Sequence, residues 1–294
     1  MKIIKAIWEL MRLEHGVMIF LGIFIGSVIS LEGWDINFWD KFILTFFTAL
    51  FLEASTFALN DYFDLEIDKK NKRFDRPLVR GDLKPKTALI LFGIFFPLGI
   101  ICSFFVNMTC FIIALITALL AILYDTHMKK VKLVGNFYIA YVMAIPFIFG
   151  AAAVLPEREI SLSLTPSVFI LALIAFLAGS GREIMKDVQD YEGDIEKGVR
   201  SFPRYIGKYK SSIVASLFYL IAIVLSFIPF IFGTFEIYYR NIYYMVIIII
   251  TDLILMITSM QLIFNKDIDL KKYRKVTLLA IFIGLIGFLL GALV

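Results

Sequence analysis

The chain has 294 residues, of which 60% are hydrophobic and 16% aromatic, and its mean hydropathy is +0.87. This composition excludes a soluble globular protein of this size and is typical of a protein that crosses the bilayer several times. The formal net charge of +4 comes from basic residues between the apolar segments. It therefore reports membrane topology and gives no support for nucleic-acid binding.

The sequence predicts a single all-α transmembrane domain over residues 1–294. Residues 3–11 are expected to form an amphipathic helix at the membrane interface, anchored by Trp8. Apolar segments long enough to cross the hydrocarbon core then follow one another along the chain. Nine transmembrane helices are predicted, near residues 15–31, 42–59, 87–106, 108–124, 134–155, 163–181, 211–233, 242–264 and 275–294.

Basic residues are distributed very unevenly over the loops that these nine helices define. The N-terminus and the second, fourth, sixth and eighth loops hold 26 of the 29 Lys and Arg residues. The other side holds Lys41, Arg158 and Arg240. Because basic loops remain in the cytoplasm, we predict a multi-pass protein of the cell membrane with a cytoplasmic N-terminus and an external C-terminus.

The second and the sixth predicted helices each end in a stripe of three aspartates on the cytoplasmic side. NDYFDLEID and KDVQDYEGD contribute these aspartates, at Asp61, Asp64, Asp68, Asp187, Asp190 and Asp194. Positions i, i+3 and i+7 share one face of a helix. Neighbouring carboxylates repel one another unless cations lie among them, and oxygen ligands suit Mg²⁺. Each stripe is therefore predicted to bind Mg²⁺.

The offset of 126 residues between the two stripes extends into the loops that follow them. It relates the pairs Pro77 and Pro203, Gly81 and Gly207, and Lys84 and Lys210. Because this offset equals four predicted helices, an even number, it indicates a tandem repeat whose copies run the same way through the membrane. The second and sixth helices are then expected to face each other across a central cavity, with both stripes at its cytoplasmic mouth.

Two acidic helix ends above an apolar cavity suit a diphosphate that carries a long hydrocarbon chain. Mg²⁺ ions bridge carboxylates to diphosphate oxygens, while the hydrocarbon extends into the cavity. The metals, together with Lys or Arg, stabilise the departing diphosphate and favour ionisation of the allylic C–O bond. The resulting carbocation is captured by an acceptor, and aromatic side chains stabilise the cation without reacting with it.

The sequence resembles the UbiA superfamily of intramembrane prenyltransferases over essentially its whole length. The resemblance is carried by NDYFDLEIDKKNKRFDRPL, YDTHMKK and GREIMKDVQDYEGDIEKGVRSFP. It implies a Mg²⁺-dependent enzyme in which Asn60 and both aspartate stripes bind Mg²⁺–diphosphate. It implies diphosphate contacts from Arg73, Arg76, Lys129 and Arg200, and catalytic roles for Asp64, Asp68, Asp190, Asp194 and Tyr124, the last near the reacting carbon.

Within this superfamily, GREIMKDVQDYEGD and the Ile- and Lys-rich composition resemble the branch that makes archaeal ether lipids. That resemblance implies transfer of a geranylgeranyl group from its diphosphate to the free hydroxyl of geranylgeranylglyceryl phosphate, in phospholipid biosynthesis. The acceptor phosphate needs cations beyond those for the donor, and Arg182 and Lys186 are candidates. The expected partners are the prenyl diphosphate donor, the phosphorylated prenylglycerol acceptor and the bilayer; no nucleic acid and no protein partner is implied.

Several polar residues have two interpretations. Glu53, inside the second predicted helix, either polarises the acceptor or bonds a neighbouring helix. His15 is a candidate acceptor contact, whereas Asp252 is expected to be a buried structural group. The positive-inside rule alone accounts for some of the basic residues, and solvated helix ends are the alternative reading of the stripes.

Three other functions are alternatives. An aromatic prenyltransferase of quinone biosynthesis would use the same aspartate stripes. A CDP-alcohol phosphotransferase would carry a single D-G-x-x-A-R-type signature, which this sequence lacks. A cation transporter would place its carboxylates near the middle of the bilayer, whereas these stripes lie at helix ends.

Overall fold

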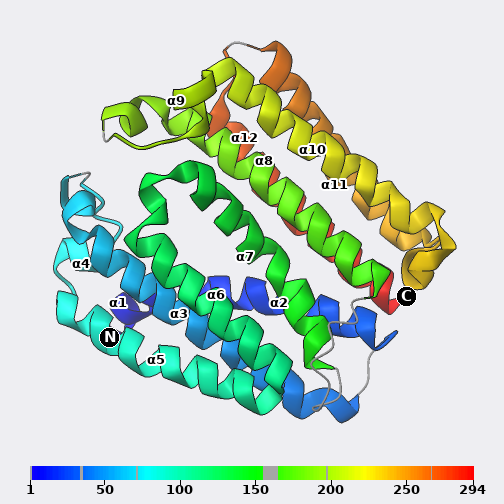
Figure 1. The fold of residues 1–294 in the computed structure, drawn as a ribbon, viewed down its shortest axis with the longest axis horizontal. Coiled ribbons are helices and arrows are strands. Elements are labelled where there is room, and N and C mark those ends of the chain that lie inside the picture. The colour runs from blue at the N-terminus through cyan, green and yellow to red at the C-terminus, as the bar shows by residue number, and fades with distance from the viewer. Residues whose placement is uncertain (1, 34–35, 71, 155–164, 197, 266) are drawn as a thin grey trace. The chain divides into compact units, whose positions relative to one another are not determined.

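The computed structural model describes the chain except for residues 1, 34–35, 71, 155–164, 197 and 266, and except for the side chains at 14, 15, 17, 18, 36 and 130. The described residues form helices and turns, without a β-strand among them. Figure 1 shows these elements, which are α1 (Lys2–Met11), α2 (Leu13–Ser30), η1 (Ile36–Phe38), α3 (Trp39–Lys70), α4 (Pro77–Arg80), α5 (Pro85–Val106), α6 (Met108–Thr126), η2 (Met128–Lys130), α7 (Lys132–Ala153), α8 (Pro166–Glu196), α9 (Phe202–Ile206), α10 (Lys208–Ile231), η3 (Gly233–Tyr238), α11 (Ile242–Phe264) and α12 (Leu270–Leu293).

The all-α membrane architecture is confirmed. In the part of the chain that the structure describes, 8 helices are long and apolar enough to cross a membrane: α3, α5, α6, α7, α8, α10, α11 and α12. The first predicted crossing falls on α2, whose side chains are described without interruption only over the apolar stretch Ile19–Ser30. The count of nine therefore stays a prediction.

The narrow break between the third and fourth predicted helices lies where the sequence placed it. α5 ends at Val106 and α6 begins at Met108. Between them, the Asn107 side chain accepts a hydrogen bond from the Cys110 backbone N–H (2.8 Å) and donates one to the Ala152 carbonyl (2.7 Å). One asparagine thus satisfies backbone groups that a helix end leaves unpaired.

The chain divides into two compact units. The first comprises residues 1–24, 35–126 and 152–162, and the second comprises residues 25–34, 127–151 and 163–294. Each unit contains one complete aspartate stripe. Whether residues 1–294 behave as a single domain stays a prediction.

In the first unit, the long helix α3 packs mainly against α5. α1 and α4 cover the polar end of α3 through a buried cluster that includes Ala6, Leu10, Leu65 and Leu78. α1 forms the predicted amphipathic helix, because Ala6 and Leu10 are buried while Trp8 remains 55% exposed. Its position at the membrane interface stays a prediction.

In the second unit, α8 packs mainly against α10, and α11 against α12. α8 and α10 approach closely at Gly181, where a Cβ atom would lie 2.9 Å from the Ala215 carbonyl oxygen. Ile184, Met185 and Tyr219 fill the adjoining core. The close approach fixes the part of α8 that leads into the second stripe.

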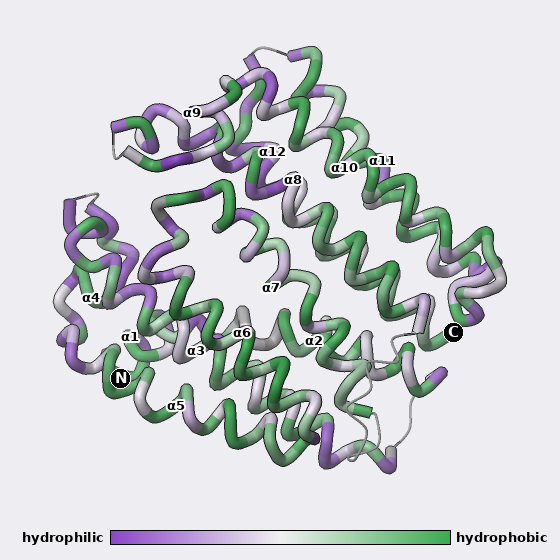
Figure 2. The backbone as a smooth tube through the Cα atoms, viewed as in Figure 1, coloured by the Kyte–Doolittle hydropathy of each residue, from purple (hydrophilic) through white to green (hydrophobic). Residues whose placement is uncertain are grey.

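The order of elements in the first unit recurs in the second. α3 is followed by the short helix α4 and then α5, and α8 is followed by the short helix α9 and then α10. Figure 2 shows hydrophilic residues near α4 in the first unit and near α9 in the second. The recurrence agrees with the 126-residue offset, although the tandem repeat itself stays a prediction.

Candidate active site

The first aspartate stripe lies on the last three turns of α3. The helix runs for 32 residues because the polar segment after the apolar one keeps helical geometry up to Lys70. Asp61 and Asp68 are 2% and 6% exposed, and Asp64 is half-buried. The predicted spacing therefore produces carboxylates along one helix, two of them almost completely buried.

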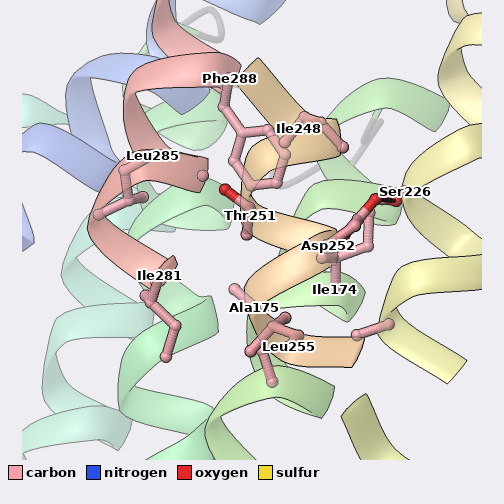
Figure 3. A pocket seen from close by; sticks show the side chains of 13 residues that line it. Ile174, Ala175, Ser226, Ile248, Thr251, Asp252, Leu255, Ile281, Leu285 and Phe288 are labelled. Carbon is pink, nitrogen blue, oxygen red and sulfur yellow. Dashed lines mark hydrogen bonds between the residues drawn. The ribbon is translucent and has the colours of Figure 1, made fainter. Parts of the chain in front are cut away.

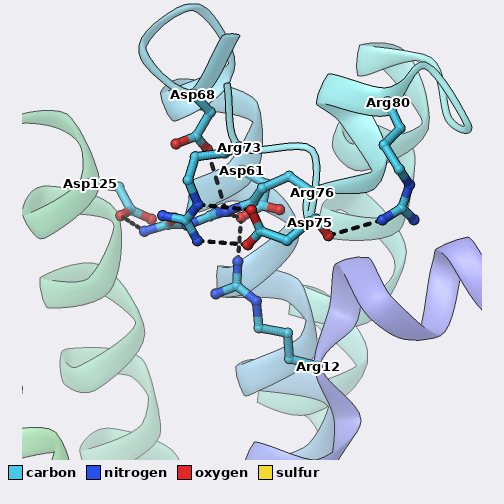
Figure 4. Close-up of polar contacts among 9 residues, drawn as sticks. Arg12, Asp61, Asp68, Arg73, Asp75, Arg76, Arg80 and Asp125 are labelled. Atoms are coloured by element: carbon cyan, nitrogen blue, oxygen red, sulfur yellow. Dashed lines mark hydrogen bonds and ion pairs between the residues drawn. The ribbon is translucent and has the colours of Figure 1, made fainter. Parts of the chain in front are cut away.

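Two guanidinium groups neutralise the inner end of this stripe (Figure 4). Arg12 Nη2 lies 2.7 Å from Asp61 Oδ1, and Arg76 Nη1 contacts the same oxygen. Arg76 Nε lies 3.4 Å from Asp68 Oδ2, so Arg76 connects the first and last carboxylates of the stripe. Arg12 also lies over the Phe57 ring, 4.4 Å from its centroid. A buried carboxylate needs such partners to remain ionised at low cost.

Asn60 and Arg73, both predicted to contact the diphosphate, have partners outside the stripe. Asn60 Nδ2 donates to Asp125 Oδ1 on α6 at 2.8 Å. Arg73 donates to both carboxylate oxygens of Asp75, at 2.9 and 2.7 Å. This paired hydrogen bond lowers the pKa of Asp75 to about 2. Tyr124 lies half-buried on α6, one residue before Asp125.

The second stripe lies at the corresponding end of α8. Asp187 and Asp194 are 2% and 8% exposed, whereas Asp190 is exposed. Lys132 Nζ lies 2.6 Å from Asp194 Oδ2 and 3.3 Å from Asp187 Oδ1. Asn136 Nδ2 donates to Asp187 Oδ2 at 2.7 Å. Lys132 and Asn136 are one turn apart at the start of α7, so this helix end supplies both partners.

Arg182 and Lys186, the candidates for the acceptor phosphate, lie on α8 just before the second stripe. Both contact Glu183, a buried residue that is not among the predicted site residues. Lys129 is half-buried in η2, and Arg200 is exposed in the loop after α8. Glu53 is half-buried on α3. The His15 side chain lies outside the part of the chain that the structure describes.

Asp252 lies in a small pocket within the second unit (Figure 3). Its neighbours there include Ser226 of α10, Thr251 of α11 and Phe288 of α12. Ser226 Oγ donates a hydrogen bond to Asp252 Oδ2 at 2.7 Å. The side chain is 7% exposed and lies in the middle of α11, a helix that carries neither aspartate stripe. This placement fits the structural role expected for Asp252.

The donor atoms of both stripes suit a hard divalent cation, because they are carboxylate oxygens. In the first stripe, Asp61 Oδ2 is buried and accepts no hydrogen bond, and Asp68 Oδ2 is buried with Arg76 Nε 3.4 Å away as an ion-pair partner but no hydrogen bond. Such unsatisfied oxygens need an explanation, and a bound cation supplies one. Among the described residues no three Asp, Glu, His or Cys side chains meet around one point, so ligands from the substrate would have to complete the coordination.

Comparison with known proteins identifies the family. The sequence matches the UbiA prenyltransferase family over residues 19–286. This chain belongs to that family. The digeranylgeranylglyceryl phosphate synthase of Archaeoglobus fulgidus is 44% identical over 291 residues, which cover 98% of this chain and 96% of that protein. The match to a UbiA family enzyme therefore extends over nearly the whole sequence.

Solved structures agree with this assignment. A structure from a study of digeranylgeranylglyceryl phosphate synthase in membranes aligns with a TM-score of 0.79 and 35% identity, and covers 99% of each chain. A UbiA homologue from Archaeoglobus fulgidus bound to DMAPP and Mg²⁺ aligns with a TM-score of 0.58 and 15% identity, over 96% of this chain and 99% of that one. At that identity the second alignment supports the fold alone.

Sequence reasoning missed four polar side chains that surround the stripes of this UbiA prenyltransferase. Among the sequence predictions, Arg12 and Lys132 are topology signals alone, and neither Asn136 nor Asp125 is a predicted site residue. Lys132 and Asn136 did carry a signal, since an i, i+4 pair at a helix start presents both side chains on one face. Arg12 carried none, because its contact with Asp61 spans 49 residues of sequence.

Proposed function

We propose that this chain transfers a geranylgeranyl group from geranylgeranyl diphosphate to the hydroxyl of geranylgeranylglyceryl phosphate, forming an ether bond of an archaeal membrane lipid. The 44% identity to a digeranylgeranylglyceryl phosphate synthase over 98% of the chain carries the proposal. The two aspartate stripes, each with two buried carboxylates paired to cations of its own unit, support it chemically. They are suited to a polyanion that arrives with metal ions.

The residues that would hold Mg²⁺ are the aspartates of the two stripes, with Asn60 beside the first. Bound there, Mg²⁺ supplies positive charge that stabilises the departing diphosphate. Arg12, Arg76 and Lys132 already lie against the carboxylates. A guanidinium or ammonium group carries several N–H donors. When a diphosphate binds, these groups would therefore donate hydrogen bonds to its oxygens as well as to the carboxylates.

The proposed reaction breaks the C1–O bond of the donor, and the bonding electron pair leaves with the diphosphate. The acceptor hydroxyl oxygen then forms the new bond to C1 and releases its proton. An alcohol is a weak nucleophile, so much of the rate has to come from holding its oxygen close to C1. The side chains of this chain would therefore act mainly by binding, orientation and charge stabilisation.

The acceptor phosphate would bind Arg182 and Lys186. These two cations precede the second stripe on α8, beyond the residues that Lys132 neutralises. Lys132 would serve the donor diphosphate, while Arg182 and Lys186 would serve the acceptor. Separate cations for the two anionic substrates would account for the basic side chains that precede Asp187, the first aspartate of the second stripe.

A direct assay tests this proposal. Purified protein, Mg²⁺ and radiolabelled geranylgeranyl diphosphate are incubated with geranylgeranylglyceryl phosphate, 4-hydroxybenzoate or a dihydroxynaphthoate, and products are separated by thin-layer chromatography. We expect prenylation of the glyceryl phosphate and its loss when EDTA is added. Efficient prenylation of an aromatic acceptor, with none of the glyceryl phosphate, would establish the quinone alternative instead.

A further inference from the structure

Three charged side chains form a compact cluster on α8, just before the second aspartate stripe. Lys186 Nζ lies 2.6 Å from Glu183 Oε2, and Arg182 Nη1 lies 3.4 Å from Glu183 Oε1. The side chains of Arg182, Glu183 and Lys186 are only 14%, 7% and 26% exposed. Each carboxylate oxygen thus engages one cation, and the glutamate joins the two.

The second aspartate stripe does not account for this cluster. Positions 126 residues earlier, which lead into the first stripe, are Thr56, Phe57 and Asn60, and none of them carries a charge. A carboxylate stripe is therefore built in this chain without such a cluster. Holding one buried carboxylate and two largely covered cations is costly in free energy, and buried ionisable groups in membrane proteins commonly serve a ligand.

The cluster also has unused binding capacity for an anion. Arg182 Nε is buried and makes no hydrogen bond. A buried guanidinium donor without a partner is uncommon in folded proteins and indicates a missing acceptor. With two cations and one carboxylate, the cluster carries a net charge of about +1. It lacks the charge balance expected of a purely structural ion pair.

We propose that Glu183 is a positioning residue that holds Arg182 and Lys186 as a preformed site for a phosphate monoester, the acceptor headgroup. This inference rests on the proposed function. Arg182 and Lys186 are one turn apart and repel each other, and both side chains are long and flexible. The carboxylate between them offsets the repulsion and fixes both cations before the phosphate arrives, which lowers the entropy cost of binding.

Three variants separate this role from a general effect on folding. Glu183→Gln removes the charge and keeps the shape, whereas Glu183→Asp keeps the charge. Glu192→Gln is the matched control, because Glu192 is a 77% exposed acid of the same helix that pairs with Lys208 outside the cluster. KM for the donor, KM for the acceptor and kcat are measured for each variant with geranylgeranyl diphosphate and geranylgeranylglyceryl phosphate.

We expect Glu183→Gln to raise the acceptor KM about tenfold, the effect of losing one hydrogen bond to a charged group. The donor KM should change less than about twofold, since the stripe and its own partners are intact. Glu183→Asp should recover most of the acceptor affinity, and Glu192→Gln should behave as wild type. A donor KM that rises as much as the acceptor KM would overturn the positioning role.

Equilibrium binding tests the site without turnover. Geranylgeranylglyceryl phosphate and its phosphate-free analogue geranylgeranylglycerol are titrated against each variant in detergent. Glu183→Gln should weaken binding of the phosphorylated lipid alone. Tighter binding of that lipid would show that Glu183 competes with phosphate, and equal weakening of both lipids would show a structural role; either result refutes the proposal. If the wild-type protein binds this lipid without prenylating it, the proposed function fails while the site stands.

Discussion

Asp61 and Asp187 begin the two stripes and have the same exposure of 2%, yet their partners differ. Asp61 is held by the guanidinium groups of Arg12 and Arg76, and Asp187 by the ammonium group of Lys132 and the amide of Asn136. The acids recur at an offset of 126, but their partners do not. A guanidinium group stays protonated at all relevant pH values and presents its N–H donors in a rigid plane. The positive charge beside the first stripe is therefore less sensitive to pH, and less mobile, than the Lys132 ammonium beside the second.

Replacing one central carboxylate in either stripe should lower turnover without unfolding the protein. Asp64→Asn and Asp190→Asn are nearly isosteric, and neither residue is fully buried. Each removes charge that would hold Mg²⁺–diphosphate, so we expect a loss of about 10²–10³-fold in kcat. Asp82→Asn, in the exposed loop after α4, is the control. Full activity of either stripe variant in the radiolabel assay contradicts the proposed site.

Lys132 should be more important for stability than other lysines of the second unit. Lys132→Met leaves Asp187 and Asp194 without their cation, and we expect a loss of about 1–3 kcal/mol in unfolding free energy, reduced from a fully buried pair because Lys132 is partly exposed. Lys208→Met removes a lysine from an exposed pair and should have little effect. Thermal unfolding in detergent measures both. Similar melting temperatures for the two variants would show that the Lys132 pairs contribute little.

α8, which carries the second stripe, packs closely against α10 at Gly181, where the Ala215 carbonyl and the Tyr219 ring of α10 lie against the glycine. Small residues allow helix backbones to approach in a membrane, where packing replaces the hydrophobic effect as the source of stability. α3 and α5 form the corresponding pair in the first unit. In both units, the helix bearing the stripe is therefore held by the helix that follows the short polar connection.

Filling the Gly181 contact should destabilise the second unit. In Gly181→Ala the new Cβ would lie 2.9 Å from the Ala215 carbonyl and 3.0 Å from the Tyr219 ring, so the helices must separate. We expect a cost of about 1–3 kcal/mol, typical of overpacking. Gly93→Ala on α5 is the control, because its Cβ would meet no atom within 4 Å. Equal thermal stability of the two variants would mean that the approach at Gly181 can relax freely.

The distribution of basic residues predicts that both stripes lie on the cytoplasmic side of the membrane. Single cysteines at Lys70 or Lys210, in a chain lacking Cys102 and Cys110, should be protected from an impermeant thiol reagent added to intact cells. A cysteine at Arg240 should react, because this residue is one of three basic residues on the opposite side. Permeabilised cells provide the control, in which all three positions should react. Reversed labelling would overturn the topology.

Local chemistry allowed the sequence alone to determine the membrane class, the helical fold, most helix boundaries and the two stripes. Hydrophobic segments of 20 residues and a spacing of i, i+3, i+7 depend only on helix geometry and bilayer thickness. The amino-acid sequences of the two aspartate motifs are specific enough to indicate the UbiA family. Even the break at Asn107 was visible, because it lies between two apolar segments.

Only the tertiary structure decided which groups neutralise which carboxylates. Arg12 and Asp61 are 49 residues apart in sequence, Asn136 and Asp187 51, Lys132 and Asp194 62. Such partners are brought together by helix packing within each unit, which no local pattern encodes. The same holds for Glu183. The sequence shows that it lies between Arg182 and Lys186, but its burial results from the packing of α8 against neighbouring helices. The same packing leaves Arg182 Nε without a hydrogen-bond partner.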